Sequence, residues 1–283
     1  MHVVTVGHVT NDHLADGVHP GGAALYAGLA AQALGAEVTL LTRAGADFVG
    51  RDLFDRFHRV HVLPAPRTTA FDERYVGTQR VVRLLAQAGP VDAPLPSADV
   101  VLLCPVTGEV PSSALAVRPA CLLAAGLQGW LRAFAPDGTS TACRLGDERR
   151  FAGCGLVSCS AEDLAGLGPE TLQALRFVVP RVAVTDGALG ARLYAGGEAW
   201  HIPALPVEAV DPTGAGDVFL ATLALQLARG AALLDAASWA SCAGAMTVTS
   251  VGPTGLGQLN TLPEALARYR REVTAPRRLR TGE

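Results

Sequence analysis

The stretch from residue 210 to 219, Val-Asp-Pro-Thr-Gly-Ala-Gly-Asp-Val-Phe, could bind an anion beside a carboxylate. Gly214 and Gly216 precede an apolar run, residues 218–227, that predicts a helix. Backbone N–H groups at a helix N-terminus have no intrahelical partner and bind anions, and glycine lets them approach a ligand closely. Asp217, in the first turn, can accept a proton from a hydroxyl held there. An anion site beside a base is what phosphoryl transfer to an alcohol requires.

A structural role is the alternative for the same stretch. Asp211 and Thr213 could form a turn and helix cap, with Asp217 a solvated acid that suits the helix dipole. However, residues 211–219 are similar to the C-terminal signature of the ribokinase-like (PfkB-type) carbohydrate and nucleoside kinases. That resemblance favours catalysis. It implies that Gly214, Ala215 and Gly216 hold the charge of the transferred phosphoryl group and that Asp217 is the base.

The composition describes a chain with a sizeable core and little net charge. Its 283 residues are 49% hydrophobic, with a net charge of −3. Apart from Arg277, Arg278 and Arg280, which could belong to a frayed end, no basic cluster suggests a nucleic-acid partner. Lysine is absent from the sequence, which excludes a Walker A site. A phosphate contact that would otherwise use lysine must therefore come from arginine.

The cysteines and the N-terminus indicate a reduced, cytoplasmic protein. No pair has the Cys-x-x-Cys spacing of a zinc site, and we expect free thiols. The predicted first strand begins at residue 2, which leaves no room for a signal peptide, and no apolar run is long enough to cross a bilayer, so no membrane partner is expected. The six cysteines are Cys104, Cys121, Cys143, Cys154, Cys159 and Cys242.

Short apolar strands alternate with helices, which predicts an α/β fold: a doubly wound, mostly parallel sheet with helices on both faces. The expected strands are residues 2–7, 37–42, 98–104, 120–125, 155–159, 182–185, 192–195 and 199–202, and the expected helices are 23–34, 49–58, 215–228 and 233–250. Ligands bind at the carboxyl ends of such strands. The candidate segments are therefore residues 11–12, 107–109, 160–163 and 185–187.

One further segment has a different pattern. Residues 71–76 and 80–85 flank Gly77 and Thr78 and predict a β-hairpin. The sequence has no internal repeat, and its proline-rich pieces look like loops rather than linkers. We expect a single ribokinase-like kinase domain over residues 1–283 with a reduced lid around residues 68–86.

The resemblance also points to an acceptor site near the N-terminus. Asp12 takes the place of the family's aspartate that holds substrate hydroxyls, a task for which a carboxylate is suited; an Asx turn is the alternative. Gly21 and Gly22 match the di-glycine that contacts sugar. Tyr26 stands where the ribokinase pattern has asparagine, which argues against ribose. It either lines the substrate site or packs against the sheet.

The spacing near the lid departs from the ribokinase pattern. Only eight residues separate Asp12 from Gly21, so the lid should rest on the 71–85 hairpin alone. The short spacer, the arginine-rich hairpin and residues 128–132 are similar to the inositol-kinase-like branch. Arg80 and Arg132 could touch substrate or phosphate, or be structural. A homodimer and a monomer both stay open.

The resemblance places an acid near metal and phosphates. Asp163 matches the acid of the family's Asn-x-x-Glu motif, with Ser160 in place of the amide. Mg²⁺ tolerates either carboxylate. The alternative is that Ser160 only caps a helix whose first turn is acidic.

The remaining donor contacts follow from the resemblance too. Thr185 and Gly187 are similar to a Thr-x-Gly turn at the nucleotide side, and Thr213 lies beside the anion site. Asp211 and Thr213, with residues 252–255, resemble loops that hold a monovalent cation in some members. The expected ligands are ATP, Mg²⁺ and, as in those members, a monovalent cation.

The function that these expectations define is an ATP-dependent transfer of the γ-phosphate to a hydroxyl of a small polyol such as a sugar or inositol. A nucleoside kinase and a non-catalytic sugar or nucleotide sensor on the same fold are the alternatives. A nicotinamide dehydrogenase is disfavoured, because the segment after the first strand lacks Gly-x-Gly-x-x-Gly.

Overall fold

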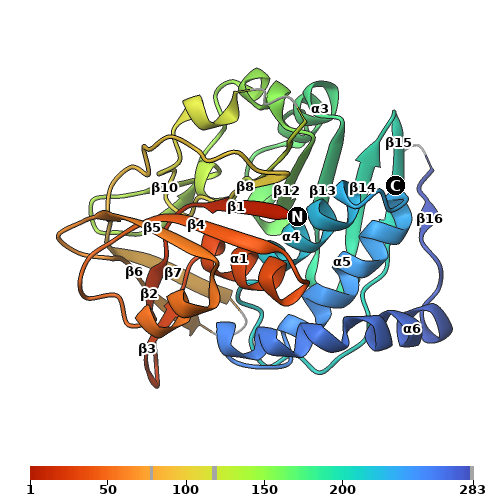
Figure 1. The fold of residues 1–283 in the computed structure, drawn as a ribbon. Coiled ribbons are helices and arrows are strands. Elements are labelled where there is room, and N and C mark those ends of the chain that lie inside the picture. Colours follow the sequence, from red (N-terminus) through yellow and green to blue (C-terminus); the bar gives the residue numbers. More distant parts are fainter. Residues whose placement is uncertain (77–78, 117–119, 281–283) are drawn as a thin grey trace.

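A computed structural model describes residues 1–76, 79–116 and 120–280, and a ten-stranded sheet runs through this part of the chain (Figure 1). In spatial order the strands are β16 (Arg277–Arg278), β15 (Glu198–Ile202), β14 (Ala191–Ala195), β13 (Arg181–Thr185), β12 (Leu156–Ser160), β9 (Leu122–Gly126), β8 (Val100–Leu103), β1 (His2–Val6), β4 (Glu37–Ala44) and β5 (Arg59–Pro64). Pairing is parallel from β5 to β13 and antiparallel from β13 to β16. The predicted mostly parallel sheet is confirmed.

Two apolar layers cover the two faces of this sheet. Successive side chains of a strand point to opposite faces. Val3 accordingly packs with one buried cluster, whereas Val4 and Val6 pack with another. This two-sided burial explains why the strands are apolar throughout rather than alternating.

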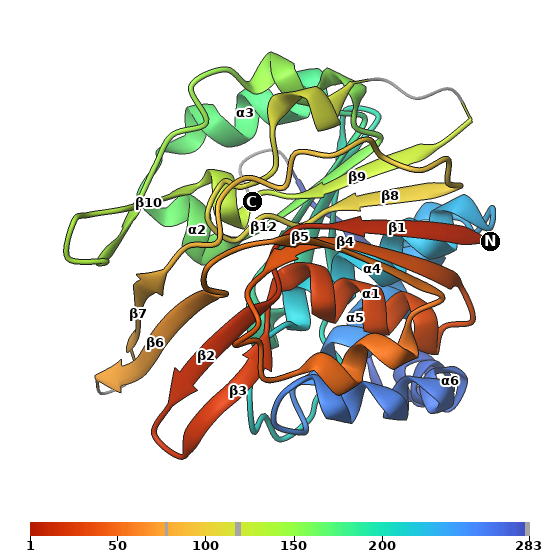
Figure 2. The same cartoon turned by 60° about the vertical axis from the view of Figure 1, so that its left-hand side comes forward.

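Helices cover both faces, as predicted (Figure 2). The long helices α1 (Ala23–Ala33), α4 (Ala215–Ala228), α5 (Leu233–Thr247) and α6 (Leu262–Glu272) gather on one face, and α2 (Ala161–Ala165) and α3 (Pro169–Val178) lie on the other. The predicted helix at residues 49–58 is wrong: the segment is a 3₁₀ helix, η1 (Arg51–Arg56). The further 3₁₀ helices are η2 (Ser112–Leu115), η3 (Gln128–Trp130), η4 (Glu148–Gly153), η5 (Gly187–Leu189) and η6 (Pro253–Thr261). In the described chain, no helix has the length and apolarity needed to cross a bilayer.

The lid is larger than the sequence predicts. The expected hairpin is present as β6 (Thr69–Val76) and β7 (Gln79–Ala86), and its turn, residues 77–78, lies outside the described residues. A second hairpin, β2 (Thr10–Leu14) with β3 (Gly17–Gly21), joins it through parallel pairing of β2 with β6. The expectation of a lid built on one hairpin is therefore wrong, because the short spacer folds back on itself as two strands.

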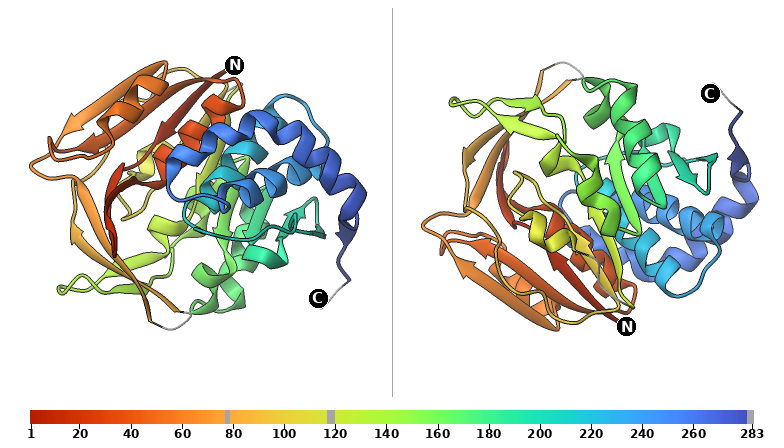
Figure 3. Two further views of the ribbon diagram at one scale, coloured as in Figure 1. Left: turned by 90° about the horizontal axis from the view of Figure 1, so that it is seen from below. Right: turned by 90° about the horizontal axis from the view of Figure 1, so that it is seen from above.

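The lid projects from the sheet on the side away from the C-terminal end of the described chain (Figure 3). A small sheet of β10 (Arg132–Phe134) and β11 (Ser140–Ala142) lies next to β7 through an isolated bridge between Arg83 and Thr139. The lid strands, the small sheet and the carboxyl ends of β8 and β9 thus surround one region of the molecule.

Candidate active site

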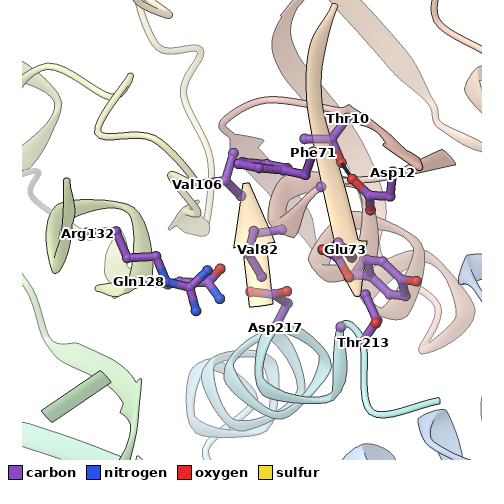
Figure 4. Close-up of a pocket in the computed structure, with 14 residues that line it drawn as sticks. Thr10, Asp12, Phe71, Glu73, Val82, Val106, Gln128, Arg132, Thr213 and Asp217 are labelled. Atoms are coloured by element: carbon purple, nitrogen blue, oxygen red, sulfur yellow. Dashed lines mark hydrogen bonds between the residues drawn. The ribbon is translucent and has the colours of Figure 1, made fainter. Parts of the chain in front are cut away.

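A pocket lies where the lid faces the carboxyl ends of the central strands (Figure 4). Its walls come from three lid strands, the start of α1, the loops after β8 and β9, and the start of α4. The lining residues are Thr10, Asp12, Gly22, Ala23, Tyr26, Phe71, Glu73, Val82, Val106, Gln128, Arg132, Thr213, Gly214 and Asp217. Among the predicted site residues, the pocket brings together Asp12, Gly22, Tyr26, Thr213, Gly214 and Asp217.

A hydrogen-bonded turn at residues 211–214 precedes α4 at the end that lies at the pocket. The Asp211 carboxylate accepts hydrogen bonds from the backbone N–H groups of Thr213 (2.9 Å) and Gly252 (3.1 Å). Gly214 then adopts a left-handed φ of 78°, and α4 begins at Ala215, with Gly216 next in its first turn. Because Gly214 lines the pocket, the N-terminal end of the helix dipole faces it, and this end attracts anions.

Asp217 is half-buried in the first turn of α4, and its carboxylate points into the pocket in Figure 4. Burial raises the pKa of the Tyr26 phenol and of the Cys104 thiol, and the negative charge of Asp217 adds to both effects. A carboxylate and a helix N-terminus therefore share one wall of the pocket, which is the arrangement that the string 210–219 predicts.

Asp12 lies on the lid side of the pocket, in β2. It is 7% exposed, and its Oδ1 accepts a hydrogen bond from the Thr10 hydroxyl (2.7 Å). A Cβ atom on Gly21 would lie 1.8 Å from Asp12 Oδ2, so glycine at 21 is a condition for this carboxylate position. Asp12 pairs within a strand with His19 and Phe71, which places it in a ladder rather than in an Asx turn.

Tyr26 lines the same pocket as Asp12 and Asp217. It is buried in α1, and burial raises its pKa far above the ordinary value, with the charges of Asp211, Asp12 and Asp217 adding to the effect. The phenol consequently stays neutral, so it can donate a hydrogen bond to an oxygen ligand. The sequence left two positions open for Tyr26, a ligand site or packing against the sheet. In the structure the residue lines the pocket and also packs in the core.

Arg132 supplies a positive charge from the opposite wall. With the Gln128 amide oriented to satisfy its neighbours, its oxygen accepts from Arg132 Nη2 (2.8 Å) and Nη1 (3.0 Å). Arg132 Nη2 also donates to Asp163 Oδ1 (3.3 Å). The Arg80 side chain lies outside the described residues.

Asp163 lies behind Arg132 and is not among the pocket-lining residues. It forms a capping box with Ser160: the Ser160 Oγ accepts from the Asp163 N–H (2.9 Å), and Asp163 Oδ2 accepts from the Ser160 N–H (3.1 Å) and hydroxyl (2.7 Å). The capping alternative for this segment is thus observed. No group of three or more metal-ligating side chains occurs in the residues that the structure describes.

Thr185 and Gly187 stand apart from this pocket. Thr185 ends β13 directly beside Ser160 of β12, and its hydroxyl donates to the Cys159 carbonyl (3.4 Å). Gly187 has a φ of 51°, with nothing within 4 Å of an added Cβ atom. Both lie at the carboxyl end of β13.

Several residues that line the pocket were not predicted as site residues from the sequence. Phe71 and Glu73 point into the pocket from β6, and Val82 does so from β7. Their spacing of two along β6 is a signal for a shared face, but which face meets the pocket depends on how the lid pairs.

The loop after β8 is anchored by a buried carboxylate. Glu109, 3% exposed, accepts from the backbone N–H groups of His8 (2.8 Å), Val106 (3.0 Å) and Thr107 (2.8 Å). The His8 ring is fully buried and bonds to Thr69 Oγ1 (2.8 Å) and to the Gly89 carbonyl (2.7 Å). These contacts tie the bases of both lid hairpins to the loop that carries Val106.

Comparisons with known proteins agree with this fold. Residues 159–258 match the model of the pfkB family carbohydrate kinases. The inositol 3-kinase of Zea mays is 31% identical over 228 residues, which are 75% of this chain and 59% of that protein. The chain therefore spans less than two thirds of that relative.

Two solved structures share the fold at low sequence identity. A pyrophosphate-dependent kinase in the ribokinase family, complexed with a pyrophosphate analogue and myo-inositol, superposes with a TM-score of 0.76 at 20% identity over 90% of this chain and 98% of the other. Ribokinase of Arabidopsis thaliana, complexed with ribose and ATP, superposes with a TM-score of 0.70 at 18% sequence identity. The superposition covers 93% of this chain and 98% of the other. The chain is therefore similar in sequence to the pfkB family carbohydrate kinases over residues 159–258, and it shares the fold of the ribokinase-family structures.

Proposed function

We propose that the protein transfers the γ-phosphoryl group of ATP to a hydroxyl of a small polyol, with an inositol or a sugar as the acceptor. One observation carries this proposal: Asp12 and Asp217 line the same pocket from opposite sides, and Gly214 at the start of α4 lines it too. A hydroxyl-binding carboxylate, a base and an anion site are the parts that the reaction needs.

In this mechanism Asp12, beside the Gly21 and Gly22 backbone, orients the acceptor by accepting hydrogen bonds from its hydroxyls. Asp217 takes the proton of the attacking hydroxyl. The oxygen of that hydroxyl forms a bond to the γ-phosphorus while the bond from phosphorus to the bridging oxygen breaks, and ADP leaves with the electron pair. The amides of residues 214–216 stabilise charge on the transferred group.

The donor side is proposed from position and resemblance. We propose that the nucleotide phosphates extend from Thr213 in the pocket lining towards Thr185 and Gly187 at the carboxyl end of β13. We do not assign Asp163 as a direct magnesium ligand, because it lies outside the pocket lining and its carboxylate faces the Arg132 guanidinium. Mg²⁺ would therefore arrive on the donor's phosphates, where it retains water. Asp211, whose carboxylate joins residues 213 and 252, is the candidate for a monovalent cation.

The acceptor class is supported by the names of the relatives. The maize relative is an inositol 3-kinase, and one structural neighbour binds myo-inositol. In this pocket Asp12, Glu73 and Asp217 offer carboxylates to an acceptor rich in hydroxyls, whereas a flat base would need a larger apolar wall. We place the protein in the cytoplasm, which suits the buried thiols of Cys104, Cys154, Cys159 and Cys242, as a monomer or a homodimer.

The test is a panel of phosphate acceptors that includes inositols, pentoses, hexoses and nucleosides. Each is assayed with ATP and, because one neighbour is pyrophosphate-dependent, with pyrophosphate. Turnover of an inositol or sugar with ATP supports the proposal. Turnover of nucleosides alone favours the nucleoside kinase, pyrophosphate as the only donor overturns the ATP assignment, and ligand binding without turnover by any donor favours a sensor.

A further inference from the structure

The hydrogen bonds of Asp163 differ from those expected of a residue that faces a metal ion. Its side chain is 6% exposed. Oδ2 accepts two hydrogen bonds from Ser160, and Oδ1 accepts one from Arg132. A carboxylate bound in this way turns its charge towards the guanidinium, not towards open solvent.

Arg132 is in turn held from two sides. Asp163 contacts Nη2, and the Gln128 oxygen contacts Nη1 and Nη2, so the plane of the guanidinium is fixed. Its side chain is 22% exposed, and in Figure 4 it extends from β10 towards Asp217. These contacts use fewer donors than the five N–H groups of a guanidinium, so donors stay available to a ligand in the pocket.

We propose that Asp163 is a positioning residue, which together with Gln128 holds the Arg132 guanidinium for the phosphate groups of the donor, and that it is not a metal ligand. This inference rests on the proposed phosphotransferase function. The transferred group carries its charge on outward oxygens, which a planar guanidinium can contact through two parallel hydrogen bonds. In a chain without lysine, this arginine is the described pocket-lining residue that can supply such a cation.

Kinetics separate a positioning role from a metal-binding role. The variants are Asp163→Asn, Arg132→Met and the double variant, each assayed over a range of Mg²⁺ concentrations. Loss of one preorganised donor should lower kcat about 10²-fold in Arg132→Met. Asp163→Asn, which keeps a capping side chain, should lower kcat about tenfold by misplacing the guanidinium.

Two results of that series decide the role of Asp163. We expect Asp163→Asn to cause no further loss in the Arg132→Met background, since residues acting through one another are not additive. We also expect the half-saturating Mg²⁺ concentration to stay unchanged. A several-fold rise in that concentration, or a full additional loss in the double variant, would overturn the proposal.

A binding experiment tests the arginine without turnover. Inorganic pyrophosphate is titrated calorimetrically into the wild-type protein and the variants in the absence of divalent metal. A lost charged hydrogen bond should raise Kd about tenfold in Arg132→Met. The matched control is Arg144→Met, because Arg144 pairs with Glu170 (2.7 Å) in an exposed ion pair outside the pocket lining and should leave Kd unchanged.

The outcomes of the titration are distinct from those of the acceptor panel. Equal pyrophosphate affinity in the wild type and Arg132→Met, or no binding by the wild type, overturns the phosphate role of Arg132. Binding that depends on Arg132 in a protein without turnover supports that role and counts against the proposed function alone. Unchanged thermal unfolding midpoints of the variants show that the losses do not come from misfolding.

Discussion

The ring of Tyr26 packs directly against the backbone of Gly214. A Cβ atom on Gly214 would lie 2.1 Å from Cδ1 of that ring, and φ at this residue is 78°. The first helix and the anion-binding start of α4 are therefore in contact at a point where only glycine fits. The tyrosine that replaces the ribokinase asparagine helps to shape the site where phosphate should bind.

Gly214→Ala should consequently impair both folding and activity. Left-handed φ is unfavourable for alanine by about 1–2 kcal/mol, and forcing a methyl group against a buried ring adds about 1–3 kcal/mol. We expect the free energy of unfolding to fall by about 2–5 kcal/mol in urea titrations. Gly216→Ala is the stability control, because an added Cβ atom there meets nothing within 4 Å. Equal stability of the two variants would contradict the steric argument.

Asp217→Asn tests the base. Removal of a general base typically lowers the rate by about 10²–10⁴. We expect kcat to fall by at least about 10², while nucleotide affinity measured by calorimetry changes little, since Asp217 acts on the acceptor's proton. A variant with near wild-type turnover would rule out the assigned role.

Glu109 should matter for stability although it does not line the pocket. Glu109→Ala leaves the N–H groups of His8, Val106 and Thr107 without their acceptor, and each unsatisfied buried donor destabilises by about 1–3 kcal/mol. We expect a loss of at least about 3 kcal/mol in chemical unfolding. Glu109→Gln keeps one acceptor oxygen and should lose less. A Glu109→Ala protein as stable as the wild type would show that the loop does not depend on this carboxylate.

The buried phenol of Tyr269 should make the free energy of unfolding depend on pH in the alkaline range. Burial raises its pKa to about 12, from an ordinary value of 10.0. Below pH 10 both states hold the phenolic proton. Between pH 10 and 12 the unfolded chain loses it while the folded protein keeps it, so rising pH favours unfolding. The contribution lost by pH 12 is about 2 kcal/mol.

The measurement is the free energy of unfolding between pH 9 and 12 for the wild type and Tyr269→Phe. The variant should be less stable at neutral pH by about 1 kcal/mol, because the Tyr269 hydroxyl donates to the Pro203 carbonyl (3.1 Å). Its stability should then fall less steeply with pH than that of the wild type. Parallel curves would exclude Tyr269 as a source of the pH dependence.

Local patterns were sufficient for the sheet and for the start of α4. Central parallel strands are apolar along their whole length, and the glycine-rich string with Asp217 marks a helix start, so residues 215–228 were predicted with the bounds that the structure has. The strand β3 was missed because Gly17 and Pro20 disfavour a strand locally, whereas pairing with β2 stabilises it. The α-helix expected at 49–58 is wrong, because the apolar spacing of this segment fits a 3₁₀ helix as well.

The sequence by itself was enough to propose the chemistry at the start of α4: a predicted anion-binding helix start and a proposed base are contiguous, and both predictions rest on residue type and spacing. Only the tertiary structure decided what faces them. Asp12 and Asp217 are separated by about two hundred residues and meet through the pairing of the lid and the packing of α1 on α4. Likewise, whether Asp163 points to a metal or to Arg132 depends on where β10 places a guanidinium, and contacts between distant strands leave no periodic signal in the chain.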